Sequence, residues 1–555
     1  MERKVKWRKI DRETAVFVVF MIGMALYYGW RMFALTPWYD ELYTYYYFIS
    51  RGPVYAAIHW PLPNNHIGYS VLSACLGIFG NSTIALRGVS YLCSLGSLIL
   101  LYRIGRKCFD HGVALISVFC YAGMKLVNQL AVQGRGYALV TFCYLVALNE
   151  LLHITAESKA LKKNYIVFGI SLIMALYAIP SSVYVVVPVC LIGGVALLMR
   201  KEFRRLCYLI LTSVISAVCT VGLYSIVWLA IGSNLLTKTE QSAYYGMGHA
   251  AIILHAPFMA LKTGIDYMLD TPYIQSVERT GYLGQLASWL RSLLNEYYTG
   301  GAAVLAVLLT AGAILAIVSI VSKIKNRRYA TETPDGTTVC KDFIEIYLAG
   351  SILCIPLMLI IQSALPYYRV FSFAGVVVAI AVTWLWQVLV RWLVRLHENA
   401  GKKEDTESIQ KYIKLEKYVP AAGCLICGIF CALKPIAPLY MVQYSAREAA
   451  IEDAYEHTDV TRANKIAVTD CDQEYLLLFL YDIGEDRVTK QPEEGDIVLA
   501  DKFLLLGELS REDLRGDMWK LYLTPEQFEE SGVKEQMEAF YENNRFILYK
   551  RKENE

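Results

Sequence analysis

Apolar runs long enough to cross a membrane recur along most of this chain. The first extends from Thr14 to Leu35, and further runs of about 18 to 25 residues, the length needed to cross a bilayer core, follow it. Hydrophobic residues make up 56% of the 555 residues, above the roughly 45–50% of ordinary soluble domains. The first run has no small-residue cleavage site after it, so we expect a retained helix. The runs predict an all-α polytopic membrane protein.

The positions of Lys and Arg predict how these helices are threaded. With about eleven membrane-spanning helices, among them 112–132 and 419–439, every basic cluster falls on one side, which the positive-inside rule makes cytoplasmic. The N-terminus is then cytoplasmic, and two segments, 36–83 and 232–299, face the outside. Ile67–Phe79 is too short to span comfortably, so we expect it to lie along the outer surface. Counting it as a span would place the basic cluster Arg103–Lys107 outside.

The composition changes after residue 440. Residues 441–555 contain 14 Lys and Arg against 27 Asp and Glu, a net charge of −13, and have no long apolar run. We therefore predict a transmembrane domain over 1–440 and a small extracytoplasmic α/β domain over 441–555. Its acidity disfavours nucleic acid as a partner. The patterns predict strands at 465–469, 496–500 and 545–551, and helices at 525–530 and 533–541.

Polar residues gather at the outer ends of the predicted helices. Asp40 and Glu41 follow the first helix directly, where a carboxylate is costly unless it is solvated or used. Arg87, Arg135 and Arg369 oppose the usual charge bias. Each could snorkel to lipid headgroups, or could hold a phosphate, for which the planar guanidinium is suited. A carboxylate facing such arginines predicts group transfer from a phosphate-linked donor, with the carboxylate as base. The same face is predicted to carry His66, Tyr137 and Tyr368.

Five stretches of the N-terminal part carry a family resemblance: Trp38-Tyr39-Asp40-Glu41, Pro63 to Tyr69, Phe79 to Arg87, Tyr102 to Arg106, and Gln133 to Leu139. Together they resemble the N-terminal half of the GT-C glycosyltransferases, in particular the group of protein mannosyltransferases and aminoarabinose transferases. The resemblance implies transfer of a sugar from a polyprenyl-phosphate carrier, with Asp40 as the catalytic base. Two departures stand out. His66-Ile67-Gly68 replaces the common His-Pro-Pro. Gly134, or Gln133 if the register shifts, stands where the second-loop motif is usually acidic.

We therefore expect a GT-C-like, inverting membrane glycosyltransferase of the plasma membrane. Asp40 is the expected base and Glu41 an orienting group. The donor and its phosphate are expected to contact Arg87, Arg135, Tyr137, Tyr368, Arg369 and His66. No cofactor and no metal site are predicted, although a divalent metal stays open. The expected partners are membrane lipids, a polyprenyl-phosphate sugar donor and an acceptor that is a lipid, a wall polymer or a protein. A lipid-linked sugar transporter, or a non-catalytic scaffold with an outer sensor domain, is the alternative.

Overall fold

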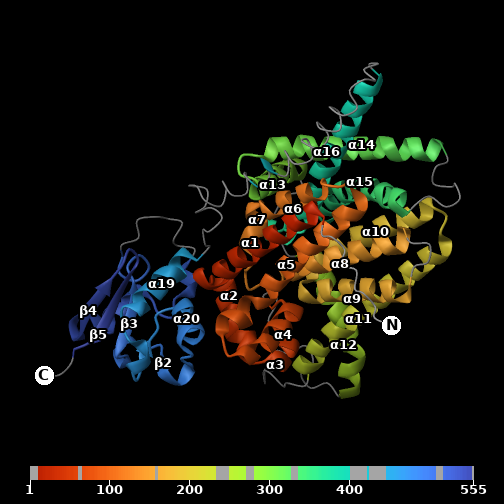
Figure 1. Ribbon diagram of the computed structural model, residues 1–555. Helices are drawn as coiled ribbons and strands as arrows, with labels where there is room; N and C mark the ends of the chain where they lie inside the picture. Colours follow the sequence, from red (N-terminus) through yellow and green to blue (C-terminus); the bar gives the residue numbers. More distant parts are fainter. Residues whose placement is uncertain are drawn as a thin grey trace, which may run out of the picture.

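A helical bundle and a smaller α/β unit at the C-terminal end make up the molecule (Figure 1). The computed structural model describes residues 11–59, 65–156, 161–232, 249–270, 281–326, 336–399, 422–423, 425, 445–507 and 517–552. The α/β unit lies beside the short helix α2 (Tyr39–Thr44), close to the end of the first long helix. The most distant parts of the sequence therefore meet next to the predicted site.

Eight helices of the described part are long and apolar enough to cross a membrane, so the chain is an integral membrane protein as predicted. The buried core lies mainly between α5, α6, α8, α15 and α16. A further helix, α9 (Lys162–Ala178), packs along α8 and α11. The last of the eleven predicted spans, 419–439, falls almost entirely outside the described residues. The eight are α1 (Arg12–Ala34), α5 (Ser82–Cys108), α8 (Tyr137–Ala156), α10 (Val183–Met199) with the preceding turn η3 (Pro180–Ser182), α11 (Phe203–Gly232), α14 (Ala302–Lys325), α15 (Gly336–Gln362) and α16 (Ala374–Asn399).

One predicted span is interrupted. The sequence predicts a single helix over 112–132, but the structure has two short ones, α6 (Ala114–Ala122) and α7 (Lys125–Leu130). Met124 between them is extended, with ψ at 132°. The side-chain amide of Asn128 donates to carbonyls on both sides of the break, at 2.6 and 2.8 Å. A backbone that leaves the helix inside a bundle needs such partners, and one buried amide supplies them here.

The described residues of the two segments predicted to face outside form several helices. After α1 the chain forms α2, the π-helical turn η1 (Tyr45–Ile49), α3 (Pro53–Ile58), α4 (Ile67–Leu76) and the 3-10 turn η2 (Gly77–Phe79). The second segment contains α12 (His249–Asp270) and α13 (Tyr282–Tyr297). Their position at an outer membrane surface stays a prediction.

The C-terminal unit is built on a five-stranded sheet of order β2-β1-β3-β5-β4. Strands β2, β1 and β3 are parallel, whereas β5 is antiparallel to both β3 and β4. Three strands and the helix at 525–530 are found where the sequence predicts them. The predicted helix over 533–541 is wrong after Gln536, because Met537–Glu542 pairs with β5 as an edge strand. The elements are α19 (Ala446–Glu456), η6 (Val460–Arg462), β1 (Ile466–Ala467), α20 (Cys471–Tyr481), η7 (Glu485–Arg487), β2 (Val488–Thr489), η8 (Pro492–Glu494), β3 (Ile497–Asp501), α21 (Pro525–Glu530), α22 (Val533–Gln536), β4 (Met537–Glu542) and β5 (Phe546–Arg551).

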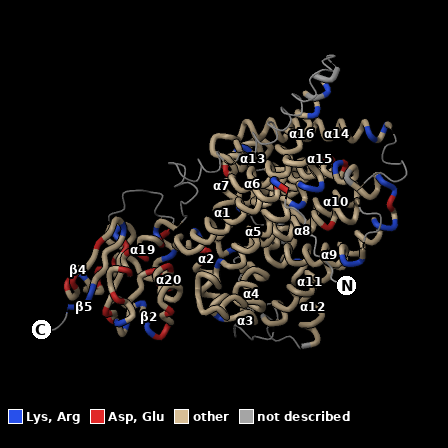
Figure 2. The backbone as a smooth tube through the Cα atoms, in the orientation of Figure 1, with Lys and Arg blue, Asp and Glu red and all other residues tan. Residues whose placement is uncertain are grey.

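Charge separates the two parts of the molecule (Figure 2). Acidic residues are dense in the C-terminal unit, whereas most of the bundle is uncharged. Basic residues gather at the ends of α9, α10 and α14 that lie away from that unit. This distribution agrees with basic clusters on one side of the membrane. Which side is cytoplasmic stays a prediction.

Candidate active site

The predicted carboxylates Asp40 and Glu41 lie in the first turn of α2, where a helix favours negative charge. Adjacent residues of a helix point in different directions. Glu41 points into the protein, with 4% of its side chain exposed, whereas the side chain of Asp40 is 17% exposed. The two carboxylates therefore have different surroundings.

Glu41 forms a buried, two-pronged ion pair with Arg87 of α5. The Nε and Nη2 atoms of Arg87 donate to the two carboxylate oxygens at 2.8 and 3.0 Å. Its Nη1 atom donates to the carbonyls of Met32 and Leu35 at the end of α1. These bonds tie α2 to α1 and α5. With its donors engaged, Arg87 has the geometry of a positioning residue, and phosphate binding by it stays a prediction.

Gly134 explains one departure from the family pattern. Its backbone N–H donates to Oε1 of Glu41 at 2.6 Å. A Cβ atom at this position would lie 2.5 Å from Cδ1 of Leu86 and 3.0 Å from the same carboxylate oxygen. An acidic side chain would clash with Leu86 and repel Glu41. The buried carboxylate of Glu41 therefore needs a residue without a side chain at position 134.

Arg135 and His66 support α2 from the other side. Nη1 of Arg135 donates to Oγ1 of Thr44 at 2.5 Å and lies 3.4 Å from the carbonyl oxygen of Asp40. Its Nη2 is 3.2 Å from Nε2 of His66, and the other ring nitrogen of His66 accepts from Gly136 N–H at 3.0 Å. Burial, with the nearby arginines, lowers the pKa of His66 well below its ordinary value. A charged His66 would set N–H groups against the donors of both Gly136 and Arg135, so a neutral ring that accepts at Nδ1 fits this site better.

Arg369 faces Asp40 from the turn η5 (Tyr368–Phe371) between α15 and α16. Its Nη2 lies 3.3 Å from Oδ2 of Asp40. The guanidinium lies over the rings of Trp38, at 5.1 Å, and Tyr367, at 4.6 Å, and it hydrogen-bonds Tyr137. Its side chain is 28% exposed, compared with 3% for Arg87. Of the three predicted arginines, Arg369 is the one that an incoming anion reaches most easily.

Helix α13 holds the turn that carries Arg369. Nε1 of Trp289 donates to the carbonyl of Pro366 at 2.9 Å, and the hydroxyl of Tyr297 donates to the carbonyl of Phe371 at 2.6 Å. The ring of Tyr368 packs against Trp289, with centroids 5.6 Å apart. Tyr368 thus has a packing contact with α13, and its predicted contact with the donor stays a prediction.

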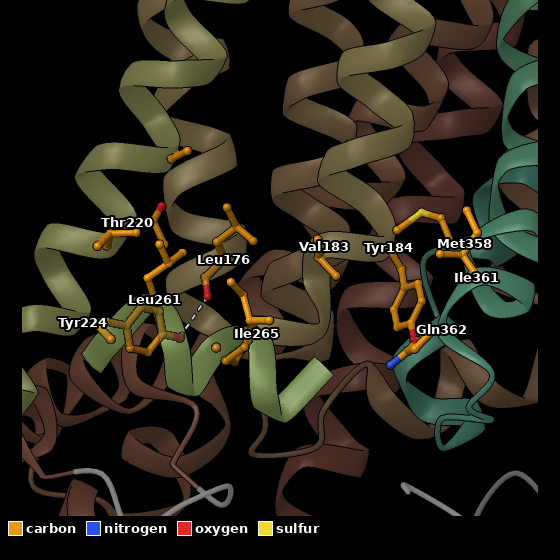
Figure 3. A pocket seen from close by; sticks show the side chains of 15 residues that line it. Leu176, Val183, Tyr184, Thr220, Tyr224, Leu261, Ile265, Met358, Ile361 and Gln362 are labelled. Atoms are coloured by element: carbon orange, nitrogen blue, oxygen red, sulfur yellow. Dashed lines mark hydrogen bonds between the residues drawn. The ribbon is translucent and has the colours of Figure 1, made fainter. Parts of the chain in front are cut away.

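An apolar cavity of 540 Å³ opens between α9, α10, α11, α12 and α15 (Figure 3). One end is formed by Tyr184 and Gln362, which hydrogen-bond each other. The ring of Tyr184 lies 5.0 Å from that of Phe371 in the turn with Arg369. One end of the cavity is therefore separated by the ring of Tyr184 from the turn that carries Arg369, and the cavity extends from there between the helices.

The C-terminal unit contacts α2 directly. Oε1 of Glu448, on α19, accepts from the backbone N–H of Tyr39 at 3.0 Å, and Glu452 accepts from the hydroxyl of Thr36 at 2.5 Å. The ammonium group of Lys520 lies 5.0 Å from the centre of the Tyr39 ring. Glu448 thus satisfies a first-turn N–H of the helix that carries Asp40, a group that otherwise lacks a partner in the helix.

The structure adds two residues that the sequence reading missed. Thr44, the partner of Arg135, is four residues after Asp40 and therefore on the same helix face, which is a usable signal. Glu448 is separated from Tyr39 by 409 positions, and nothing in the local sequence marks it. Of the predicted set, Asp40, Arg369 and Tyr137 come together, while Glu41 pairs with Arg87 and His66 with Arg135.

Comparison with known families confirms the predicted resemblance to the GT-C membrane glycosyltransferases. Residues 67–229 match the family of dolichyl-phosphate-mannose-protein mannosyltransferases. The matched segment runs from α4 into α11 and contains Arg87, Arg135 and Tyr137. No curated protein sequence matches the chain.

Two solved structures of membrane transferases are distantly similar. ArnT from Cupriavidus metallidurans bound to undecaprenyl phosphate has 14% sequence identity and a TM-score of 0.46, over 96% of this chain and 97% of that one. The archaeal oligosaccharyltransferase AglB from Archaeoglobus fulgidus, in complex with an inhibitory peptide and a dolichol-phosphate, has 12% identity and a TM-score of 0.42, over 84% of this chain. The chain spans 64% of the length of AglB.

Proposed function

We propose that this protein is an inverting glycosyltransferase that moves a sugar from a polyprenyl-phosphate carrier to an acceptor hydroxyl at the outer face of the membrane. The observation that carries the proposal is the partly open pair of Asp40 and Arg369, 3.3 Å apart, beside an apolar cavity in the bundle. A base and a phosphate-binding cation at one point are what such a transfer requires.

Asp40 is the proposed base. It takes the proton of the acceptor hydroxyl as the oxygen forms a bond to the anomeric carbon. The bond from that carbon to the phosphate oxygen breaks, and its electron pair leaves with the carrier phosphate. Attack and departure on opposite faces of the sugar invert the configuration.

Arg369 is the proposed phosphate ligand. Its guanidinium lies against Asp40. An incoming phosphate competes for the guanidinium, whose planar donors suit phosphate oxygens. Once the guanidinium turns to the phosphate, the Asp40 carboxylate is free to accept the hydrogen bond of the acceptor hydroxyl.

The apolar cavity suits the prenyl chain of the donor. It is lined by Leu176, Val183, Leu261, Ile265 and Met358 among others (Figure 3). Because the bilayer core is itself apolar, the chain would be held by van der Waals contacts with this lining. The chain would lie along the helices while its phosphate reaches the turn of Arg369.

Asp40→Asn tests the proposal. Asn keeps the size of the side chain but cannot accept the proton, so transfer should fall by about a hundred- to ten-thousand-fold, the usual contribution of a general base. The assay uses the purified protein with a panel of polyprenyl-phosphate sugars. Binding of undecaprenyl phosphate should persist, and Asp459→Asn, on the exposed surface of the C-terminal unit, should behave like the wild type. Near-full transfer by Asp40→Asn would remove Asp40 from the mechanism.

A further inference from the structure

A second cavity, of 570 Å³, lies between the π-helical turn η1 and the C-terminal unit. We call it the interdomain cavity. On one side it is lined by Tyr46 and Tyr47, which follow Asp40 by six and seven residues. The other side is formed by Glu474, Glu485, Val488, Thr489, Lys490, Gln491 and Glu494.

The tyrosines join the two walls of the interdomain cavity. The hydroxyl of Tyr46 donates to carboxylate oxygens of Glu474, at 2.9 Å, and of Glu485, at 3.0 Å. The hydroxyl of Tyr47 lies 3.3 Å from that of Tyr475. These contacts fix the C-terminal unit against η1, so the interdomain cavity exists only when the unit is docked.

The charges of the interdomain cavity balance. Each of its carboxylates has a cation within 3.6 Å, so the site favours neither a polyanion nor a polycation. The pairs are Glu474 with Lys490 at 3.5 Å, Glu485 with Arg51 at 3.6 Å, and Glu494 with Lys465 at 2.9 Å.

Aromatic rings together with carboxylate, hydroxyl and amide groups suit a neutral, hydroxyl-rich ligand. The rings present apolar faces, and the polar groups exchange hydrogen bonds with hydroxyls. Tyr46 lies within roughly 10 Å of Asp40 along the helix axis, at the usual rise of about 1.5 Å per residue. A chain of a few linked sugars is long enough to span this distance from the interdomain cavity to Asp40.

We propose that the interdomain cavity binds the acceptor, and that the acceptor is a neutral glycan. The proposal rests on the proposed function for the identity of the reaction. It adds that the C-terminal unit selects the acceptor while the transmembrane part binds the donor.

A blocking substitution tests this assignment. Gln491 is exposed and lines the interdomain cavity, so Gln491→Trp fills space there without disturbing the core. Glu538→Trp is the matched control, because Glu538 is exposed on β4, at the opposite edge of the sheet from β2. Full-length proteins in lipid nanodiscs are titrated with neutral tetrasaccharides of glucose and of N-acetylglucosamine, with saturation-transfer NMR as the readout.

The wild type and Glu538→Trp should bind at least one tetrasaccharide. Gln491→Trp should bind it about tenfold more weakly or not at all, which corresponds to roughly 1.4 kcal/mol. All three should bind undecaprenyl phosphate equally. Equal tetrasaccharide binding by Gln491→Trp, or binding of an anionic glycerol-phosphate polymer or a peptide in place of both sugars, would overturn the proposal. Asp40→Asn should retain tetrasaccharide binding. Full transfer by this variant would refute the assignment of Asp40 as the base, but it would not contradict the assignment of the interdomain cavity as the acceptor site.

Discussion

At the scale of residues, helix geometry gives two neighbouring carboxylates opposite environments. Glu41 is held by both prongs of Arg87 and by the Gly134 N–H. Removing one partner of such a buried pair leaves an unpaired charge, which costs far more than the pair contributes. Asp40 pairs with a partly exposed arginine, which agrees with the role of base proposed for it. Glu41 holds α2 in place.

Arg369→Ala should weaken the binding of undecaprenyl phosphate by about ten- to a hundredfold, since a hydrogen bond to a charged group contributes roughly 1.5–3 kcal/mol. Arg369→Lys should restore only part of the affinity, because the planar fork is lost. The measurement is a titration of the purified variants with the lipid. Arg462→Ala, a substitution at a highly exposed side chain, is the control and should leave affinity unchanged. Equal affinity in Arg369→Ala would return this arginine to a packing role.

The residue types of the candidate site could be predicted from the sequence. Which residues hold the structure and which face the substrate could not. Carboxylates and arginines at membrane edges are chemically conspicuous. Which arginine is buried depends on contacts over long distances in the chain, as for Glu41 with Arg87. The sequence therefore indicates which residue types are present, but not which of them are accessible to a substrate.

At the scale of elements, hydrophobic length predicts most of the membrane helices, because a span needs a long apolar run. It fails for α6 and α7, where the otherwise apolar run contains Lys125, Asn128 and Gln129 and the amide of Asn128 supports the break. It also fails for β4. The residues over 533–541 do not distinguish a helix from an edge strand until β5 is present as a partner.

The loop between α7 and α8 gives a prediction at this scale. Gly134→Ala should lower stability by about 1–3 kcal/mol, the usual cost of inserting a methyl group into a packed site, since its Cβ would overlap Leu86. Transfer should fall as well, because Glu41 loses its place. Thermal unfolding of the purified variants is the measurement. Gly222→Ala, in α11 with open space around it, is the control. An equally small change in both variants would show that the loop adapts freely.

At the scale of the whole molecule, the C-terminal unit completes α2 through Glu448. Glu448→Ala should remove the acceptor for the Tyr39 N–H and increase amide exchange in the peptide over 38–47, measured by mass spectrometry on the full-length protein. Glu448→Gln keeps an accepting oxygen and should exchange like the wild type. Glu456→Ala, exposed on the same helix α19, is the control. Unchanged exchange in Glu448→Ala would show that α2 does not depend on this contact.

We expect Glu448 to make the stability of the folded protein depend on pH. Burial raises its pKa to about 7, with Asp472 adding to the shift and Lys520 opposing it. A carboxyl group with a raised pKa in the folded state stabilises that state below its ordinary pKa, and this contribution is lost as the pH rises through 7. Glu448→Gln cannot ionise. As the pH rises from 5 to 8, the melting temperature of Glu448→Gln should therefore increase relative to that of the wild type. A constant difference between the two melting temperatures would contradict the raised pKa of Glu448.

The bond between Tyr39 and Glu448 has a consequence for the order in which the protein is made. Tyr39 leaves the ribosome first, and its partner follows only after 408 further residues have been joined. Until then the backbone N–H of Tyr39 lacks this acceptor, and the interdomain cavity has one wall. We expect a chain cut off before Glu448 to transfer no sugar, because its proposed site would lack the residue that caps α2.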